Sequence, residues 1–284
     1  MKDKLKLAVL GSPIAHSRSP QLQALFASNV GINDFSYERI EVTEETLLKT
    51  IERLRSEGYD GFNCTMPLKT EMARIADECT EEAKILTSSN TVTIRDGKFY
   101  ADTTDGIGIL LSIRRALDEF DKTVEECIKG KRAVLIGAGG AARSAALSLK
   151  NAGAKLTVLN RTLSLANELS DMIGGCECFA LDADTLYAAV SDADILINCT
   201  SLGMTGKAEF ESLDFIDALP SGAIVIDAVY EPLETAFLCR ARERGLAAVS
   251  GLWMLVYQGA AAFEKWSGVM PDEDACARAF ELIK

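Results

Sequence analysis

One stretch decides the fold of this chain: Ala133-Val134-Leu135-Ile136-Gly137-Ala138-Gly139-Gly140-Ala141-Ala142-Arg143. Ala133–Ile136 is a short, continuously apolar segment, which is typical of a buried parallel strand. It leads directly into a Gly-x-Gly-x-x-Ala turn and a helix. This order is the fingerprint of a dinucleotide site, because the helix N-terminus offers oriented N–H groups to a diphosphate. We therefore predict dinucleotide contacts from Gly137, Ala138, Gly139, Gly140 and Ala141.

The next strand ends at Asn160-Arg161-Thr162, where an acidic residue normally holds the ribose 2′-hydroxyl of NAD. An arginine stands there instead, and its guanidinium suits a 2′-phosphate. We therefore favour NADP over NAD, with Asn160, Arg161 and Thr162 as contacts. The alternative is a solvated Arg161 beside a Thr162 that only caps a helix. A further loop, Asn198–Met204, follows another strand, and we expect its Thr200 beside the nicotinamide half of the cofactor.

Short apolar strands alternate with helical patterns through the second half of the chain. The predicted strands are Ala133–Ile136, Lys155–Leu159, Glu177–Ala180, Ile195–Ile197, Ala223–Ile226 and Ala247–Val249. Such alternation indicates a parallel, doubly wound sheet. The polar segment Asp121–Lys131 separates this series from a long helix predicted over residues 104–120.

The first hundred residues alternate as well. The predicted strands are Leu5–Gly11, Phe35–Val42, Gly61–Met66, Thr91–Ile94 and Phe99–Ala101, the last two flanking the hairpin signal Asp96-Gly97. The last helices, Gly251–Trp266 and Pro271–Ile283, have no strand partner in the second half, so they can return to the first domain. We predict an α/β fold with an N-terminal α/β substrate domain closed by C-terminal helices (1–105 plus 252–284). A Rossmann-like, doubly wound NADP-binding domain occupies 106–251.

Composition narrows the possible partners. The chain has 284 residues and a net charge of −12, which argues against nucleic acid and anionic membranes. No apolar run is long enough for a membrane span, and the N-terminus is a poor match to a secretion signal, so we expect a cytoplasmic protein. His16 is the single histidine and there is no Cys-x-x-Cys, so no metal site is expected. An anionic ligand would need local positive charge or backbone N–H groups.

A second informative stretch is Gly61-Phe62-Asn63-Cys64-Thr65-Met66-Pro67-Leu68-Lys69. It predicts a buried strand that stops at Pro67, which cannot donate to a sheet, and that delivers Lys69 onto the following turn. An ammonium held at a strand end can protonate or deprotonate a substrate oxygen. A solvated lysine after a strand is the alternative.

Taken together, these residues resemble the shikimate dehydrogenase family over essentially the whole chain. The matching stretches of the first half are Gly11-Ser12-Pro13-Ile14-Ala15-His16-Ser17-Arg18-Ser19-Pro20, Asn63-x-Thr65-x-Pro67-x-Lys69, Asn90-Thr91 and Thr104-Asp105-Gly106. Those of the second half are Gly137–Arg143, Asn160-Arg161-Thr162, Asn198–Met204, Asp227-x-x-Tyr230-x-Pro232-x-x-Thr235 and Gly251-Leu252-x-Met254-Leu255-Val256-x-Gln258.

The resemblance implies reversible, NADP-linked reduction of 3-dehydroshikimate to shikimate, a step of chorismate and aromatic amino acid biosynthesis. It implies Lys69 and Asp105 as the catalytic pair, with Lys69 as acid, base or hydrogen-bond polariser. The implied substrate contacts are Ser17, Ser19, Asn63, Thr65, Asn90, Tyr230 and Gln258, the two serines holding the substrate carboxylate. Gly251 and Met254 join the implied cofactor contacts. His16 is expected to be structural.

Several alternatives remain open. Thr103, Leu68, Cys64 and Cys199 depart from the usual family pattern, which leaves substrate range and loop packing open. A quinate or dual quinate/shikimate dehydrogenase is the nearest alternative, and a non-catalytic NADP-sensing protein is the alternative from another class. A small-molecule substrate is the expected partner, and the chain is expected to be a monomer or a homodimer.

Overall fold

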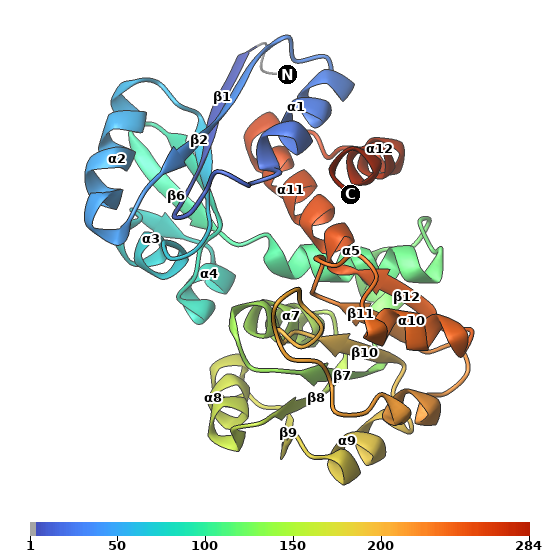
Figure 1. Ribbon diagram of the computed structural model, residues 1–284. Helices are drawn as coiled ribbons and strands as arrows, with labels where there is room; N and C mark the ends of the chain where they lie inside the picture. Colours follow the sequence, from blue (N-terminus) through green and yellow to red (C-terminus); the bar gives the residue numbers. More distant parts are fainter. Residues whose placement is uncertain (1–3) are drawn as a thin grey trace. The chain divides into compact units, whose positions relative to one another are not determined.

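The computed structural model describes residues 4–284, and they form two compact units (Figure 1). Unit 1 comprises residues 4–104 and Val256–Lys284, and unit 2 comprises Asp105–Leu255. The chain passes from unit 1 to unit 2 after Thr104 and returns within helix α11 (Gly251–Ser267). From the sequence, we expected the two domain boundaries between residues 105 and 106 and between residues 251 and 252. In the described part of the chain, no helix is long and apolar enough to cross a membrane.

Unit 1 is built on a mixed sheet with the strand order β2-β1-β3-β5-β6-β4. The strands are β1 (Lys4–Gly11), β2 (Asp34–Glu41), β3 (Gly61–Cys64), β4 (Glu78–Cys79), β5 (Thr91–Arg95) and β6 (Lys98–Asp102). β1 pairs parallel with both β2 and β3, whereas β5 pairs antiparallel with β3 and β6. Asp96 and Gly97, which join β5 and β6, both have positive φ, as a tight hairpin turn requires.

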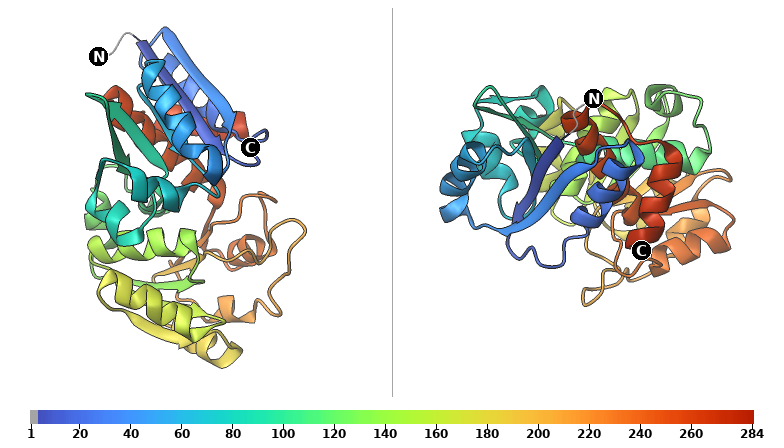
Figure 2. Two further views of the ribbon diagram at one scale, coloured as in Figure 1. Left: turned by 90° about the vertical axis from the view of Figure 1, so that its left-hand side faces the viewer. Right: turned by 90° about the horizontal axis from the view of Figure 1, so that it is seen from above.

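Helices cover both faces of the unit 1 sheet (Figures 1 and 2). They are α1 (Ser19–Asn29), α2 (Glu44–Ser56), α3 (Lys69–Ile75), α4 (Glu81–Leu86), α12 (Glu273–Ile283) and the later part of α11. On one face, Leu47, Ile51 and Leu54 of α2 join a core cluster with Leu10 and Phe62 of the sheet. The opposite face carries α1, α11 and α12, so the C-terminal helices do return to the first domain.

A glycine lets α11 approach the sheet closely. Trp266 donates from its indole N–H to the Val92 carbonyl over 2.9 Å. A Cβ on Gly61 would lie 2.3 Å from both the indole nitrogen and that carbonyl oxygen. Only a residue without a side chain at position 61 leaves room for this hydrogen bond, which anchors the C-terminal segment to β5, the neighbour of the strand that precedes Lys69.

Unit 2 is a doubly wound parallel sheet with the strand order β12-β11-β10-β7-β8-β9. The strands are β7 (Arg132–Ile136), β8 (Lys155–Asn160), β9 (Glu177–Ala180), β10 (Ile195–Asn198), β11 (Ile224–Asp227) and β12 (Ala247–Ser250). Neighbouring strands pair parallel throughout. The strand order changes direction at β7: β8 and β9 follow on one side of it, and β10, β11 and β12 on the other. Ligands of such sheets bind at the carboxyl ends of the strands beside this switch point. The predicted fold class is confirmed.

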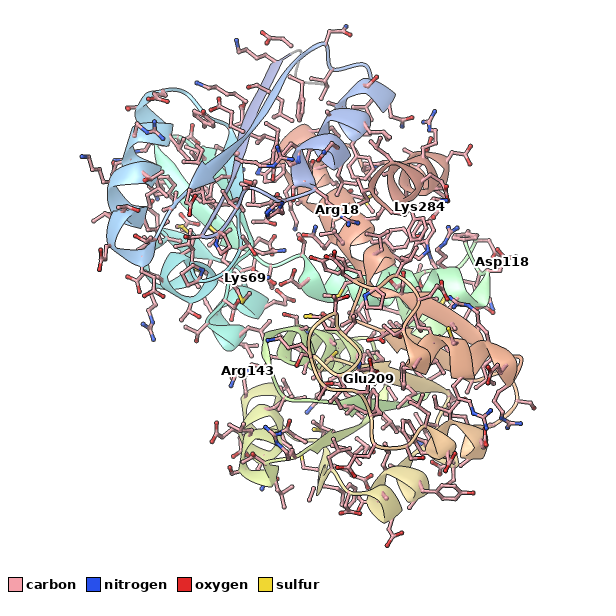
Figure 3. All side chains as sticks on the ribbon, in the orientation of Figure 1. Arg18, Lys69, Asp118, Arg143, Glu209 and Lys284 are labelled. Carbon is pink, nitrogen blue, oxygen red and sulfur yellow. The ribbon has the colours of Figure 1, made fainter. Side chains whose placement is uncertain are left out.

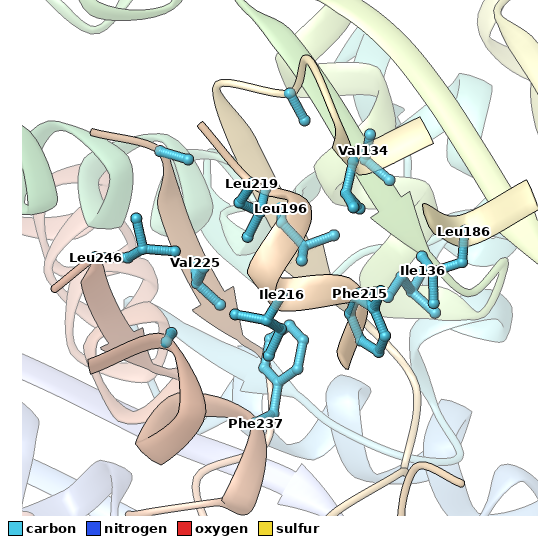
Figure 4. Packing of buried hydrophobic residues seen from close by; sticks show 14 of the residues in the cluster. Val134, Ile136, Leu186, Leu196, Phe215, Ile216, Leu219, Val225, Phe237 and Leu246 are labelled. Carbon is cyan, nitrogen blue, oxygen red and sulfur yellow. The ribbon is translucent and has the colours of Figure 1, made fainter. Parts of the chain in front are cut away.

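The helices of unit 2 are α5 (Asp105–Leu117), α6 (Val124–Ile128), α7 (Gly140–Asn151), α8 (Leu163–Ile173), α9 (Ala183–Val190) and α10 (Ala236–Glu243), with a short 3-10 helix, η1 (Asp214–Ala218). One core cluster joins the sheet to α9, η1 and α10, and Phe215 and Phe237 lie in it beside Val225 and Leu196 (Figure 4). Burial of these apolar side chains fixes the sheet whose carboxyl edge carries the predicted cofactor loops.

The structure corrects some predicted boundaries. β3 ends at Cys64 rather than Met66, because the Thr65 N–H bonds to Leu10 and the chain then turns toward α3. The polar segment Asp121–Lys131 contains α6, which begins with a capping box between Thr123 and Glu126. Neither β4 nor α4 was predicted, and both are short.

Candidate functional site

The glycine loop of unit 2 has the shape that a dinucleotide needs. Gly137 has φ +110°, and a Cβ there would lie 3.1 Å from Thr200 Cγ2, so the loops after β7 and β10 are in contact. Gly139 is the N-cap of α7 and has no side chain to occupy the helix end. A Cβ on Gly139 or Gly140 would project into open space. These residues therefore leave room for a diphosphate against the free N–H groups of α7.

A charged donor lies near the same helix end. Arg143 stands in the first turns of α7 (Figure 3), and its Nε is buried without a hydrogen-bond partner among residues 4–284. A buried charged donor is stabilised by an acceptor, and a polyanion at this helix end supplies one. The sequence motif contained Arg143, but nothing in the sequence showed that its Nε would be buried.

Arg161 and Thr162 follow β8 and are exposed. Within residues 4–284, the Arg161 guanidinium makes no hydrogen bond or ion pair, and Thr162 is the N-cap of α8 without a side-chain cap bond. Asn160 donates to the Thr162 carbonyl over 2.8 Å, which shapes the turn. A guanidinium and a hydroxyl, both available on one turn, suit a phosphate group.

A buried polar network holds the loop that carries Thr200. Asn198 Oδ1 accepts from both the N–H and the hydroxyl of Thr200, over 3.0 and 2.7 Å. Asn198 Nδ2 in turn donates to Asp227, which also accepts from Thr235 over 2.6 Å. Burial raises the pKa of Asp227, while these hydrogen bonds oppose the rise. The network joins the ends of β10 and β11 to the start of α10.

The remaining predicted residues of unit 2 lie at defined places. Gly251 begins α11, and a Cβ there would meet the Ala228 carbonyl oxygen at 2.2 Å, so close backbone packing excludes a larger residue. Met254 is half-buried on α11, and Tyr230 is 40% exposed on the loop after β11. Asp105 is the first residue of α5, where the helix dipole favours a carboxylate.

Three predicted amide side chains meet in unit 1. Asn63 donates to the Asn90 carbonyl and to Thr91, over 2.9 and 3.1 Å. Asn90 donates to Gln258 over 3.1 Å and to Thr104 over 3.0 Å. Both donor hydrogens of Asn63 and of Asn90 are therefore committed inside unit 1, while the acceptor oxygen of Asn63 takes one hydrogen bond, from Tyr37, and keeps a second lone pair for another donor. Sequence reasoning named the three amides but not this orientation.

Lys69 is half-buried at the first position of α3, after Thr65 and Pro67 (Figure 3). Its carbonyl accepts from Ser89, next to Asn90. The ammonium also lies close to Cys64, where burial raises the thiol pKa to about 12 and Lys69 opposes the rise. Lys69 thus stands beside the amide network, at the end of the strand that carries Asn63.

The serine turn, residues 14–19, leads into α1, whose first residue is Ser19. Ser17 Oγ accepts from the Ser19 N–H over 3.3 Å, so its own hydroxyl hydrogen is available to an acceptor. Two residues that sequence reasoning missed contact this turn or the amides: Arg39 bonds the Ser17 carbonyl, and Tyr37 bonds Asn63. Both lie on β2, which is separated from β3 by β1, and contacts that depend on the order of strands in a sheet cannot be read from sequence.

The structure thus brings the predicted residues together in two groups, one in each unit. The amides, the serine turn, Thr65 and Lys69 belong to unit 1. Asp105, Tyr230 and the predicted cofactor contacts belong to unit 2. Across residues 4–284, no three His, Cys, Asp or Glu side chains gather as ligands for a metal ion.

A Rossmann-type unit joined to an α/β unit that presents a lysine among amides defines a two-domain, dinucleotide-dependent oxidoreductase. Three family models match the chain: the shikimate dehydrogenase substrate binding domain over residues 9–92, shikimate / quinate 5-dehydrogenase over 119–211, and the shikimate 5'-dehydrogenase C-terminal domain over 251–282. The chain belongs to the shikimate dehydrogenase family.

Individual relatives and solved structures are similar to the chain over nearly its whole length. The shikimate dehydrogenase (NADP(+)) of Roseobacter denitrificans is 37% identical over 98% of each chain. The shikimate 5-dehydrogenase of Thermus thermophilus, solved with NADP(H) and shikimate, has a TM-score of 0.81 and 32% identity over 99% of this chain and 100% of that one. The 5-ketofructose reductase of a Gluconobacter strain has a TM-score of 0.83 and 29% identity over 99% of each chain.

Proposed function

We propose that this protein catalyses the reversible, NADP-dependent reduction of 3-dehydroshikimate to shikimate. The observation that carries the proposal is the Asn63–Asn90–Gln258 network beside Lys69. Oriented amides suit a substrate with several ring hydroxyls, and a site built on them rejects analogues that lack those hydroxyls. The family membership supports the same substrate.

In this proposal unit 1 binds the substrate. Ser17 and Ser19 hold the carboxylate, since hydroxyl donors satisfy it without burying an unpaired cation. Asn63 Oδ1 accepts from a ring hydroxyl, while Asn90 orients Gln258 toward another. Thr65 and Tyr230 complete the substrate contacts. Lys69 gives a proton to the ketone oxygen during reduction and takes it back from the hydroxyl in the reverse direction, and Asp105 assists this transfer.

Unit 2 holds the cofactor, which supplies the hydride. The free N–H groups at the start of α7 bind the diphosphate, and Arg161 with Thr162 binds the 2′-phosphate. The loop around Thr200, with Gly251 and Met254, lines the nicotinamide side. Among residues 4–284 the Arg161 guanidinium has no hydrogen-bond or ion-pair partner that would compete with a 2′-phosphate, and this supports NADP over NAD.

Steady-state assays of shikimate and quinate, each with NADP⁺ and NAD⁺, test the proposal. We expect the highest kcat/KM for shikimate with NADP⁺. A preference for quinate with NAD⁺ would replace it with the quinate alternative. Faster turnover of a keto sugar without a carboxylate, such as 5-ketofructose, would instead indicate an activity like that of the 5-ketofructose reductase to which the chain is similar.

We further propose that the protein works in the cytoplasm, as a monomer or a homodimer, on the route to aromatic amino acids. Light scattering of the purified protein, with and without NADP⁺, distinguishes the two assembly states. A larger assembly would contradict this part of the proposal.

A further inference from the structure

Two side chains of β2 contact the proposed substrate site although neither belongs to the residues assigned above. The register of β1 with β2 and β3 places Tyr37 and Arg39 on the same face of the sheet as Asn63. The neighbouring residues Glu38 and Ile40 face α2 on the other side, because side chains alternate along a strand. β2 therefore points a phenol and a guanidinium toward the face that carries α1 and the serine turn.

Arg39 makes a paired contact with the backbone of the serine turn. Its Nε and Nη2 both donate to the Ser17 carbonyl, over 2.9 and 2.7 Å, and Nη2 also donates to Gln21 over 3.2 Å. Within the described part of the chain, this guanidinium has no acidic partner. Its charge is therefore not neutralised, and it lies at the residue whose hydroxyl is proposed to bind a carboxylate.

Tyr37 joins the strand that carries Asn63 to the same turn. Its hydroxyl donates to Asn63 Oδ1 over 2.6 Å. The Ser19 hydroxyl is the second hydrogen-bonding neighbour of the phenol, and burial raises the pKa of Tyr37. The phenol therefore stays protonated and fixes the acceptor oxygen of Asn63.

The overall charge gives these contacts their significance. The protein carries a net charge of −12, which repels an anionic substrate. A cation held at the serine turn offsets this field locally, whereas the serines themselves carry no charge. We propose that Tyr37 and Arg39 are positioning residues for a carboxylate-bearing substrate, and that Arg39 also supplies the positive charge that attracts it. This inference rests on the proposed function.

The chain offers a matched control for each residue. Arg55 is also an exposed arginine of unit 1 that donates to a backbone carbonyl, that of Gly97, but it lies on α2. Tyr59 also donates its hydroxyl to a side chain, that of Glu38, on the opposite face of β2. Arg55→Gln and Tyr59→Phe therefore remove the same groups away from the serine turn.

The test measures kcat and KM for shikimate at saturating NADP⁺ and several salt concentrations. We expect Arg39→Gln to raise KM about three- to tenfold, the range for one partly exposed charge contact, with kcat within about twofold of wild type. Salt screens both the repulsion by the net charge and the attraction by Arg39, so kcat/KM of Arg39→Gln should rise more steeply with salt than that of wild type. Arg39→Lys should keep the wild-type salt dependence, because the charge remains. It should still raise KM, though less than Arg39→Gln, because lysine cannot make the paired contact.

Tyr37→Phe should raise KM while the salt dependence and NADP⁺ affinity stay at wild-type values. Both control variants should match wild type, and unfolding temperatures establish that all variants are folded. If Arg39→Gln and Tyr37→Phe match their controls in KM and salt dependence while wild type turns over shikimate, the inference is wrong and the proposed function stands. If wild type does not turn over shikimate, the proposed function fails and the inference fails with it.

Discussion

Lys69 follows a strand in the sequence, and the family resemblance implies a catalytic role for it. In the structure it is half-buried at the start of α3, close to the thiol of Cys64, and its carbonyl accepts from the Ser89 N–H, next to Asn90. A half-buried lysine at this place is consistent with the proposed proton transfer, which a substitution tests directly.

We expect Lys69→Ala to lower kcat about 10²–10⁴-fold, the range for loss of a general acid–base group. Thermal unfolding should change little, since the side chain is not part of a core cluster. Lys84, an exposed lysine of the same unit that pairs with Glu81, is the matched control, and Lys84→Ala should keep full turnover. Wild-type turnover by the Lys69 variant would show that another group transfers the proton.

We propose that Arg161 determines the choice between NADP⁺ and NAD⁺. Arg161→Ala should weaken NADP⁺ binding by about 1.5–3 kcal/mol, the scale of one charged hydrogen bond, and leave NAD⁺ binding unchanged. Calorimetric titration of both cofactors measures the difference. Arg132, exposed at the other end of the sheet, serves as the control residue. Equal losses for NADP⁺ and NAD⁺ would mean that Arg161 contacts something other than the 2′-phosphate.

Residue identities were largely accessible from the sequence, whereas their orientations were not. The motif around Asn63 and Lys69 indicates a site because polar residues stand where a buried strand ends. That Asn63 commits both of its amide hydrogens inside the protein depends on Asn90 and Thr91, which lie at the start of β5. Tyr37 and Arg39 escaped notice because their position relative to Asn63 depends on the register of β2, β1 and β3.

At the scale of single elements, the start of α7 has to cap a helix and, in our proposal, leave space for the cofactor diphosphate. Gly139 caps the helix with φ −78°, a conformation open to any residue, and a Cβ there would meet no atom within 4 Å. The protein's own packing therefore does not demand a glycine at this position. We propose that the cofactor diphosphate, which approaches this helix end, requires the absence of a side chain.

We therefore expect Gly139→Ala to lower the stability of the protein by about 1 kcal/mol or less, the scale of alanine at a helix N-cap, while lowering affinity for NADP⁺. Gly61→Ala provides the contrast, because its Cβ would collide with Trp266 and Val92 and should destabilise unit 1 by about 1–3 kcal/mol, the usual effect of overpacking. Chemical unfolding and cofactor titration on both variants separate the two effects. An unchanged NADP⁺ affinity in Gly139→Ala would place the diphosphate elsewhere.

Long, strongly patterned elements could be predicted from the sequence, and short ones could not. The apolar strands of unit 2 and the hairpin at Asp96-Gly97 were visible because period and turn residues agree. β4 contains only Glu78 and Cys79, too few residues for any period to show. α6 was hidden in a polar segment, although Thr123 and Glu126 carry a capping signal that could have revealed it.

At the scale of the whole molecule, each unit has its own sheet and its own proposed ligand. A ligand stabilises the state that binds it, by about 2.7 kcal/mol at a hundred times its dissociation constant. Opening reactions confined to one unit should respond only to the ligand of that unit.

We therefore expect NADP⁺ to slow hydrogen exchange of the β7, β8 and β10 amides, and shikimate alone to slow exchange in β3 and β5. Mass spectrometry of exchanged peptides measures both. Arg161→Ala, titrated with NADP⁺ at the same concentration, is the control for cofactor binding. Uniform protection by either ligand would mean that the two units open as one.

The composition of unit 1 from both ends of the chain has a consequence for how the protein is made. Unit 2 is one uninterrupted segment, so a ribosome delivers all of it before Val256 is synthesised. Unit 1 cannot close until Trp266 reaches the Val92 carbonyl, a contact between residues 174 positions apart. Until then, α1 alone covers the sheet face on which α11 and α12 later pack, while the other unit can already fold. We therefore expect the incomplete unit 1 to be the part of a nascent chain that is most prone to aggregation.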